Sequence, residues 1–166
     1  AAAWDKTQNA IALEKLAIAA VDLGSLSISA DIGNATEYLF ALDQNVAMNA
    51  AFGLTVRQVV IKATDDGAGA IVWPLAASQE GATDVEAYRT KMAGFAEGLA
   101  LQLLGSTDAA RQLGTALGDF VTGRKGSVTI TITSKDAKGI PLALFMAAQN
   151  DPSMLTGLVD VVGASS

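Results

Sequence analysis

The stretch that decides the fold class is Ser127-Val-Thr-Ile-Thr-Ile-Thr133. Its aliphatic residues alternate with hydroxyl residues, so in a strand the two kinds point to opposite faces of the sheet. A strand buried on both faces of a parallel sheet would read as a continuous apolar run instead. The alternation therefore predicts an antiparallel sheet with one apolar and one polar face.

Two further regions extend this sheet. Residues Glu14 to Val21 and Ser25 to Asp31 flank Asp22-Leu23-Gly24, a short link of the kind that closes hairpins. Leu54 to Thr64 is rich in β-branched residues and predicts another strand, closed by a turn at Asp65-Asp66-Gly67. In the second hairpin arm we expect four residues to face the core: Leu26, Ile28, Ala30 and Ile32.

A helical hairpin is expected between these strands. A capping box from Thr83 to Glu86 starts a helix over Asp84 to Leu104, which Gly105 ends. A second helix is expected from Ser106 or Thr107 to about Thr122. The apolar stripe of the first helix recurs at steps of three and four: Val85, Tyr88, Met92, Phe95, Leu99 and Leu103.

The remaining elements are shorter. Asn34 as N-cap, with Glu37 three residues later, predicts a helix of about three turns that fades before Gly53. The segment from Gly69 to Gly81 fits either a strand at Ile71 to Trp73 or a helical turn that begins at Pro74. Two short helices are expected near the end, one opened by Pro141 and one capped by Asp151-Pro152 that leads to Leu158.

Together these patterns predict an α+β fold, an antiparallel sheet of four or more strands with helices packed on one face. No linker divides the chain, so we expect residues 1–166 to form a single domain, whether complete or part of a longer chain. The stripe of the 84–104 helix is expected to pack on Leu26, Ile28, Val128, Ile130 and Ile132. Phe95→Ala should then cost about 3–5 kcal/mol, and Thr131→Ala on the other face should be near neutral.

Two absences limit the chemistry. The chain has no histidine and no cysteine, so the commonest general base, the commonest metal ligand and the thiolate nucleophile are all missing. We therefore expect no metal, no cofactor and no catalytic residue that can be named. What remains for catalysis is acid–base chemistry by carboxylates, lysine or tyrosine.

Carboxylates carry the alternative function, a hydrolase or lyase without metal, histidine or cysteine chemistry. Two carboxylates about 5–10 Å apart would be required. Asp65-Asp66-Gly67 could also hold a cation, but it lacks the spaced oxygen ligands of a calcium loop, so an ordinary hairpin turn is the preferred interpretation. The candidates for the carboxylate pair are Asp65, Asp66, Asp84, Glu86 and Glu97.

The charge and composition of the chain limit the classes of partner that it could bind. The formal net charge is −6, which argues against nucleic acid and against anionic membrane surfaces. Five positive charges between Arg111 and Lys138 are interrupted by acidic residues and fit a solvated face. No run approaches the ~20 apolar residues that a membrane span needs. The Gly-x-x-x-Gly spacings at Gly94–Gly98 and Gly114–Gly118 predict close approach of the helices.

The order of elements also resembles a known group of proteins. The strand from Leu54 to Gly67, the helix pair from Thr83 to Thr122, the strand at Ser127 to Thr133 and the tail from Ile140 are similar in layout to the C-terminal part of uncharacterised exported proteins of Gram-negative bacteria. That resemblance implies a periplasmic or otherwise exported protein and a longer parent chain. The lack of cysteine suits an oxidising compartment.

These observations favour a non-catalytic module of the cell envelope. Missing chemistry, together with more small and aliphatic residues than polar function requires, points to binding rather than to catalysis. The expected partner is a protein or an apolar small molecule, bound between the sheet and the helices. The sequence does not indicate an oligomeric state.

Overall fold

The computed structural model describes residues 1–148, 150–155 and 157–166. Two compact units make up the chain. Unit 1 comprises Ala1–Leu16, Ile28–Val60 and Thr131–Asp160, and unit 2 comprises Ala17–Ser27, Ile61–Ile130 and Val161–Ser166. The long strands contribute residues to both units, so each unit contains a part of the sheet.

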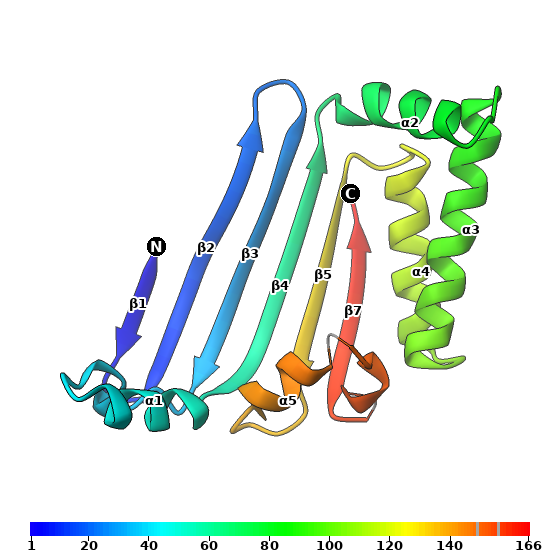
Figure 1. Cartoon of the computed structure of the whole chain (residues 1–166). Helices are drawn as coiled ribbons and strands as arrows, with labels where there is room; N and C mark the ends of the chain where they lie inside the picture. The colour runs from blue at the N-terminus through cyan, green and yellow to red at the C-terminus, as the bar shows by residue number, and fades with distance from the viewer. Residues whose placement is uncertain (149, 156) are drawn as a thin grey trace. The chain divides into compact units, whose positions relative to one another are not determined.

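An antiparallel sheet runs through the described residues, as predicted (Figure 1). The order of its strands is β1-β2-β3-β4-β5-β7, and β6 pairs with β4. Ala2 of β1 lies opposite Leu13 of β2, and Val56 of β4 lies opposite Ile140 of β6. With the helices described below, the sheet confirms the α+β class. The strands are β1 (Ala2–Asp5), β2 (Ala10–Ala20), β3 (Gly24–Gly33), β4 (Thr55–Asp65), β5 (Ser127–Ser134), β6 (Ile140–Pro141) and β7 (Val159–Ser165).

The predicted hairpin is the connection between β2 and β3. Its turn places Asp22 at φ 61° and Gly24 at φ 132°. A side chain at Gly24 could not be accommodated, because a Cβ there would lie 2.1 Å from the carbonyl oxygen of Thr64. The strands β1, β6 and β7 were not predicted. β1 has only four residues, and β7 contains Gly163 and lacks clear alternation.

Unit 1 contains a 3₁₀ helix η1 (Glu37–Phe40) and two short helices, α1 (Gln44–Phe52) and α5 (Leu142–Ala147). The predicted capping box at Asn34 is wrong. Asn34 has φ 55°, and its amide donates to the carbonyl of Gly53 at 2.7 Å instead of capping a helix. The N-cap of α1 is Asp43, whose carboxylate accepts from the N–H of Asn45 at 2.8 Å. The end of α1 before Gly53 is confirmed.

The helix expected after Asp151 is a short 3₁₀ helix, η2 (Pro152–Leu155). Leu158 itself lies in a turn and not in a helix. The predicted span includes residue 156, which lies outside the described residues. The helix opened by Pro141 is confirmed as α5, with Pro141 at its N-cap position.

Unit 2 contains α2 (Ala68–Gln79), α3 (Val85–Leu104) and α4 (Asp108–Val121). The ambiguous segment after Gly67 is helical throughout, with Pro74 inside the helix. The turn at Asp65-Asp66-Gly67 is therefore not a hairpin turn, because it leads from β4 into α2. The Asp65 carboxylate accepts from the N–H groups of Gly67 and Gly69, each at 3.0 Å, and so satisfies donors at the start of the helix.

The pair α3 and α4 forms the predicted helical hairpin. The N-cap of α3 is Asp84 rather than Thr83, and that of α4 is Thr107. Close approach involves only one of the two predicted glycine pairs. A Cβ at Gly114 of α4 would lie 3.1 Å from the Cα of Glu97, whereas Gly94 and Gly98 of α3 have open space around them.

The helix that packs on the sheet in unit 2 is α4, not α3. A Cβ at Gly163 of β7 would lie 2.7 Å from the Cα of Leu113, so the helix and the strand are in close contact. α4 accordingly buries Ala110, Leu113, Gly114, Ala116 and Gly118.

The expected packing of the α3 stripe on the sheet is wrong for most of its length. Phe95 is 60% exposed, and Leu99 and Leu103 are also exposed. A loss of about 3–5 kcal/mol in the free energy of unfolding is therefore no longer expected for Phe95→Ala, because truncation of an exposed side chain leaves little cavity behind. Of the sheet residues expected beneath this stripe, Val128 is buried, but Leu26 is 46% exposed. Tyr88 is the stripe residue that is buried.

Candidate functional site

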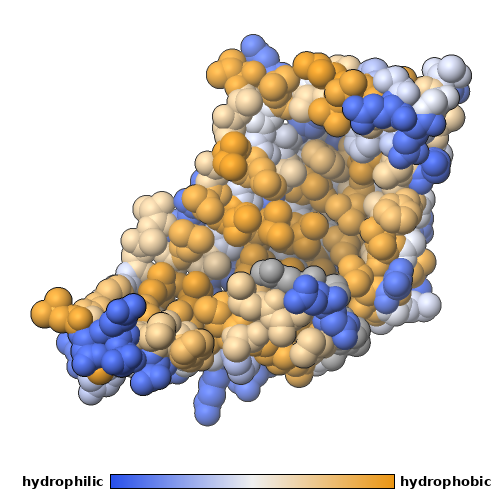
Figure 2. Space-filling view, in the orientation of Figure 1, coloured by the Kyte–Doolittle hydropathy of each residue, from blue (hydrophilic) through white to orange (hydrophobic). Residues whose placement is uncertain are grey.

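The main candidate site is a set of exposed apolar side chains in unit 2, called here the apolar surface of unit 2. Three elements supply it: β3, α2 and α3. Hydrophobic residues gather over the strands beside α2 and α4 (Figure 2). Exposed apolar patches on a folded chain mark candidate interaction sites. Its members are Leu26 of β3, Ile71, Val72 and Leu75 of α2, and Phe95, Leu99 and Leu103 of α3.

Hydroxyl contacts identify the two faces of the sheet in unit 2. The hydroxyls of Ser25 and Thr64 are 2.9 Å apart, and those of Ser127 and Ser166 are 2.7 Å apart. These side chains therefore share the polar face, and alternation places the neighbouring Leu26 on the apolar face. Gly163, three residues before Ser166, is on the apolar face as well, so α4 covers that face at β7 and leaves Leu26 exposed.

The junction of α2 and α3 is held by polar and aromatic contacts. Trp73 and Tyr88 have ring centroids 6.5 Å apart, and the guanidinium of Arg89 lies 5.8 Å from the Trp73 ring centroid. The Tyr88 hydroxyl donates to a carboxylate oxygen of Glu80 at 3.1 Å. Burial, and then the hydrogen bond and the negative charge of Glu80, raise the pKa of Tyr88 above its usual value. Arg89 also donates to the carbonyl of Val121 at 2.8 Å.

The five candidate carboxylates have separate structural positions. Asp65 binds the start of α2, and Asp84 caps α3 by accepting from the N–H of Ala87 at 2.9 Å. Glu86 pairs with Arg89 at 3.7 Å, and Glu97 lies against Gly114. Asp66 is exposed beside the turn. Four of the five thus have contacts typical of a fold rather than of a reaction centre.

Among the described residues, no three or more histidine, cysteine, aspartate or glutamate side chains are grouped so that they could hold a metal ion. The basic residues between Arg111 and Lys138 include members of ion pairs. Arg111 pairs with Asp108, Arg124 with Asp119 and Lys135 with Asp160. The side chain of each of these three cations is at least half exposed, as expected for a solvated face.

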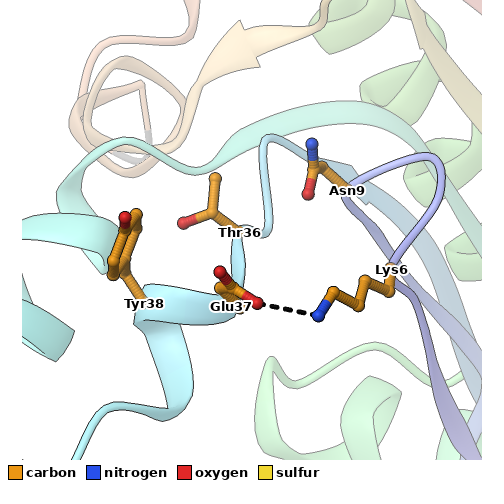
Figure 3. Close-up of a pocket in the computed structure, with 5 residues that line it drawn as sticks. All are labelled: Lys6, Asn9, Thr36, Glu37 and Tyr38. Carbon is orange, nitrogen blue, oxygen red and sulfur yellow. Dashed lines mark ion pairs between the residues drawn. The ribbon is translucent and has the colours of Figure 1, made fainter.

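A groove of about 310 Å³ lies in unit 1 and was not predicted (Figure 3). An ion pair crosses it, with the Lys6 ammonium 2.8 Å from a carboxylate oxygen of Glu37. The hydrogen bond and the attraction between them raise the pKa of Lys6 and lower the pKa of Glu37. Because each charge already has a partner and both are well exposed, the groove presents a solvated pair. Its lining residues are Lys6, Asn9, Thr36, Glu37 and Tyr38.

Strand β1 contacts the 3₁₀ helix η1 of the same unit through an aromatic pair. Trp4 donates from its indole nitrogen to the carbonyl of Ala35 at 2.7 Å, and its ring centroid is 4.8 Å from that of Phe40.

A second groove in unit 1, of about 660 Å³, is formed by the turn after β5 together with β6 and the start of α5. Its charged residue Lys135 is paired with Asp160, and the Asp136 carboxylate accepts from the N–H of Lys138.

Comparison with known proteins gives one match. A family model described as "Uncharacterized protein" matches residues 17–165, which is most of the chain. No curated protein and no solved structure matches. Within the part of the chain that the structure describes, no helix combines the length and the hydropathy needed to cross a membrane.

Proposed function

Because the chain belongs to this family of uncharacterized proteins, we propose a function from its own surface: a non-catalytic module of the cell envelope that binds a partner through the apolar surface of unit 2. The observation that carries this proposal is the exposed stripe of Phe95, Leu99 and Leu103. Complete burial of a fully exposed side chain of this size is worth about 1.5–3 kcal/mol, and the still exposed 39–60% of each of these three leaves about half of that to be gained when a partner covers them.

A partner protein fits this surface better than an apolar small molecule does. Small-molecule sites are concave and enclose about 70–90% of the ligand. The side chains concerned lie on a strand and two helices, and many are more than half exposed, as in the core of a protein interface before binding. An apolar ligand remains the second outcome of the test below.

Location in the envelope is part of the same proposal. The resemblance to exported proteins and the absence of cysteine support it. Fractionation of cells that express the natural gene tests the location by itself. Recovery in the cytosolic fraction would remove the envelope from the proposal and leave the binding surface unaffected.

Site-specific photo-crosslinking in cells of the natural host tests the binding surface. A photo-reactive phenylalanine analogue replaces Phe95 in one variant and Leu42 in a control, because Leu42 is an exposed apolar residue of unit 1 and lies outside the apolar surface of unit 2. We expect a discrete adduct of protein mass from position 95 and none from position 42. An adduct of lipid mass would instead identify an apolar ligand.

Two results would overturn the proposal. One is the absence of any adduct at position 95 in a variant that remains folded by circular dichroism. The other is equal yield at positions 95 and 42, which would indicate random collision rather than a specific surface. Phe95→Asp provides a further check, since it should abolish recovery of the same adduct from a crosslinker placed at Leu99.

A further inference from the structure

Helix α2 has no charged side that would decide which of its faces turns inward. Its residues read Ala-Gly-Ala-Ile-Val-Trp-Pro-Leu-Ala-Ala-Ser-Gln, without a charged side chain. A surface helix usually turns an apolar stripe inward and charged residues to water, and this pattern is absent from α2. All residues of α2 are described, and the helix buries only Gly69 and Ala77. Its rotation about its own axis must therefore be fixed by particular side-chain contacts.

One such contact joins Trp73 of α2 to Arg89 of α3. The Arg89 guanidinium lies 5.8 Å from the centroid of the Trp73 ring, within the range of a cation–π interaction. Successive residues of an α-helix are about 100° apart around the axis, so residues two positions away point to nearly the opposite side. Ile71 and Leu75, two residues before and after Trp73, are accordingly 61% and 58% exposed. The contact with Arg89 thus determines that Ile71 and Leu75 face outward.

Arg89 is in turn fixed by α4. Its side chain is only 15% exposed, and its Nε donates to the carbonyl of Val121 at 2.8 Å. At Gly123, which has φ 73°, a Cβ would lie 2.5 Å from Nη2 of Arg89, so the guanidinium occupies space that a side chain would otherwise take. α4 itself packs on β7 through Leu113. Contacts therefore connect the sheet through α4 and Arg89 to Trp73.

A second contact, at the end of α2, constrains the helix less. Glu80 follows the last residue of α2, accepts from the Tyr88 hydroxyl and pairs with Lys91 at 3.4 Å. The side chains of Glu80 and Lys91 are 53% and 70% exposed, and ion pairs in water contribute little. Trp73 lies in the middle of α2 and meets a mostly buried cation, so its contact is the stronger constraint on rotation.

We propose that Arg89 is the positioning residue of the apolar surface of unit 2. Through Trp73 it fixes the rotation of α2, and Ile71 and Leu75 then join the exposed side chains of α3. The importance of this rotation for binding rests on the proposed function, whereas the rotation itself is a property of the free chain. A guanidinium suits this role because it can stack on a ring and donate to a carbonyl at the same time.

The position of Trp73 is tested in the free chain by acrylamide quenching of fluorescence. A Trp4→Phe background leaves Trp73 as the one tryptophan. We expect Arg89→Gln to raise the quenching constant about twofold, because the ring loses the cation that covers it. Lys91→Gln is the matched control, since it removes a cation of the same helix that pairs with Glu80, and it should leave the constant unchanged. Equal constants for Arg89→Gln and its parent would overturn the proposal.

The consequence for the surface is tested by crosslinking to the partner. The photo-reactive analogue is placed at Leu75 of α2 in one series and at Phe95 of α3 in the other. We expect Arg89→Gln to lower the ratio of adduct yields, position 75 to position 95, at least about threefold. Trp73→Leu should lower the same ratio while the bond from Arg89 to Val121 is kept, so it replaces Arg89→Gln if that variant does not fold.

The outcomes separate this proposal from the proposed function. A general loss of structure would lower both yields and leave their ratio unchanged, which would overturn the positioning role of Arg89. Absence of adducts from both positions in the otherwise unchanged chain would overturn the binding function instead. The quenching constants of Arg89→Gln and Lys91→Gln would then still decide whether Arg89 positions Trp73.

Discussion

The two helices of the αα-hairpin in unit 2 differ in what covers them. α4 is packed on both sides, against Gly163 of the sheet and against Glu97 of α3, and its buried residues are mostly small. α3 contacts α4 but leaves Phe95, Leu99 and Leu103 exposed. An apolar stripe thus indicates that a helix face needs a partner, while the buried small residues of α4 lie where a partner within the chain is in contact.

The largest expected difference between the helices is in their response to truncation. Leu113→Ala should lower the free energy of unfolding by about 2–4 kcal/mol, because Leu113 is buried between α4 and β7. Phe95→Ala should lower it by less than about 1 kcal/mol, because its side chain is mostly exposed. Urea melts of both variants provide the measurement. Equal losses would show that Phe95 is covered within the free chain.

Glycine replacement should distinguish the same helices with a smaller effect. Gly94→Ala should stabilise the chain by up to about 1 kcal/mol, since alanine is the better helix former and a Cβ there has open space. Gly114→Ala should lose that gain or destabilise the chain, because its Cβ would lie 3.0 Å from a side-chain carbon of Glu97. Thermal melts of the two variants decide this, and a similar gain at Gly114 would contradict close packing of the hairpin.

The smallest effect concerns pH and the buried end of α3. The folded chain raises the pKa of Tyr88, so it favours the neutral phenol. The resulting stability is fully present below the ordinary tyrosine pKa of about 10 and is lost as pH rises through the higher folded pKa. Urea midpoints measured across this alkaline range should fall more for wild type than for Tyr88→Phe. Tyr38→Phe, at an exposed position, should leave the fall unchanged.

Elements with strict local patterns were predictable from the sequence. The alternation at Ser127 to Thr133 and the β-branched run after Leu54 became β5 and β4, because the period of a strand is a property of the backbone. The hairpin of α3 and α4 followed from its caps and glycines. Features that depend on distant segments were missed, such as the hydrogen bond from Asn34 to Gly53 and the pairing of β7 with β5. The contact of Asp65 with the start of α2 is local, but the Asp-Gly pair there is equally typical of a hairpin turn.

The sequence predicted that the candidate site is an apolar binding site, but not which face of the fold carries it. The absence of histidine and cysteine, together with the many aliphatic residues, indicated a binding function. The stripe from Val85 to Leu103 included several residues of the apolar surface of unit 2. The stripe was assigned to the core because periodicity records that a face is apolar and not which element covers it. The contact of Leu113 with Gly163 and the hydrogen bond from the Ser165 hydroxyl to the Asp119 carboxylate at 3.3 Å show that α4 is the helix that packs on β7.

The two tryptophans make each unit visible by itself in a fluorescence experiment. The ring of Trp4 lies tilted against that of Phe40 in unit 1, and Trp73 lies beside Tyr88 and Arg89 in unit 2. Trp4→Phe therefore leaves an emission signal from unit 2 alone, and Trp73→Phe leaves one from unit 1. Superimposable denaturation curves from the two variants would describe a single cooperative transition, and separate midpoints would give each unit a stability of its own.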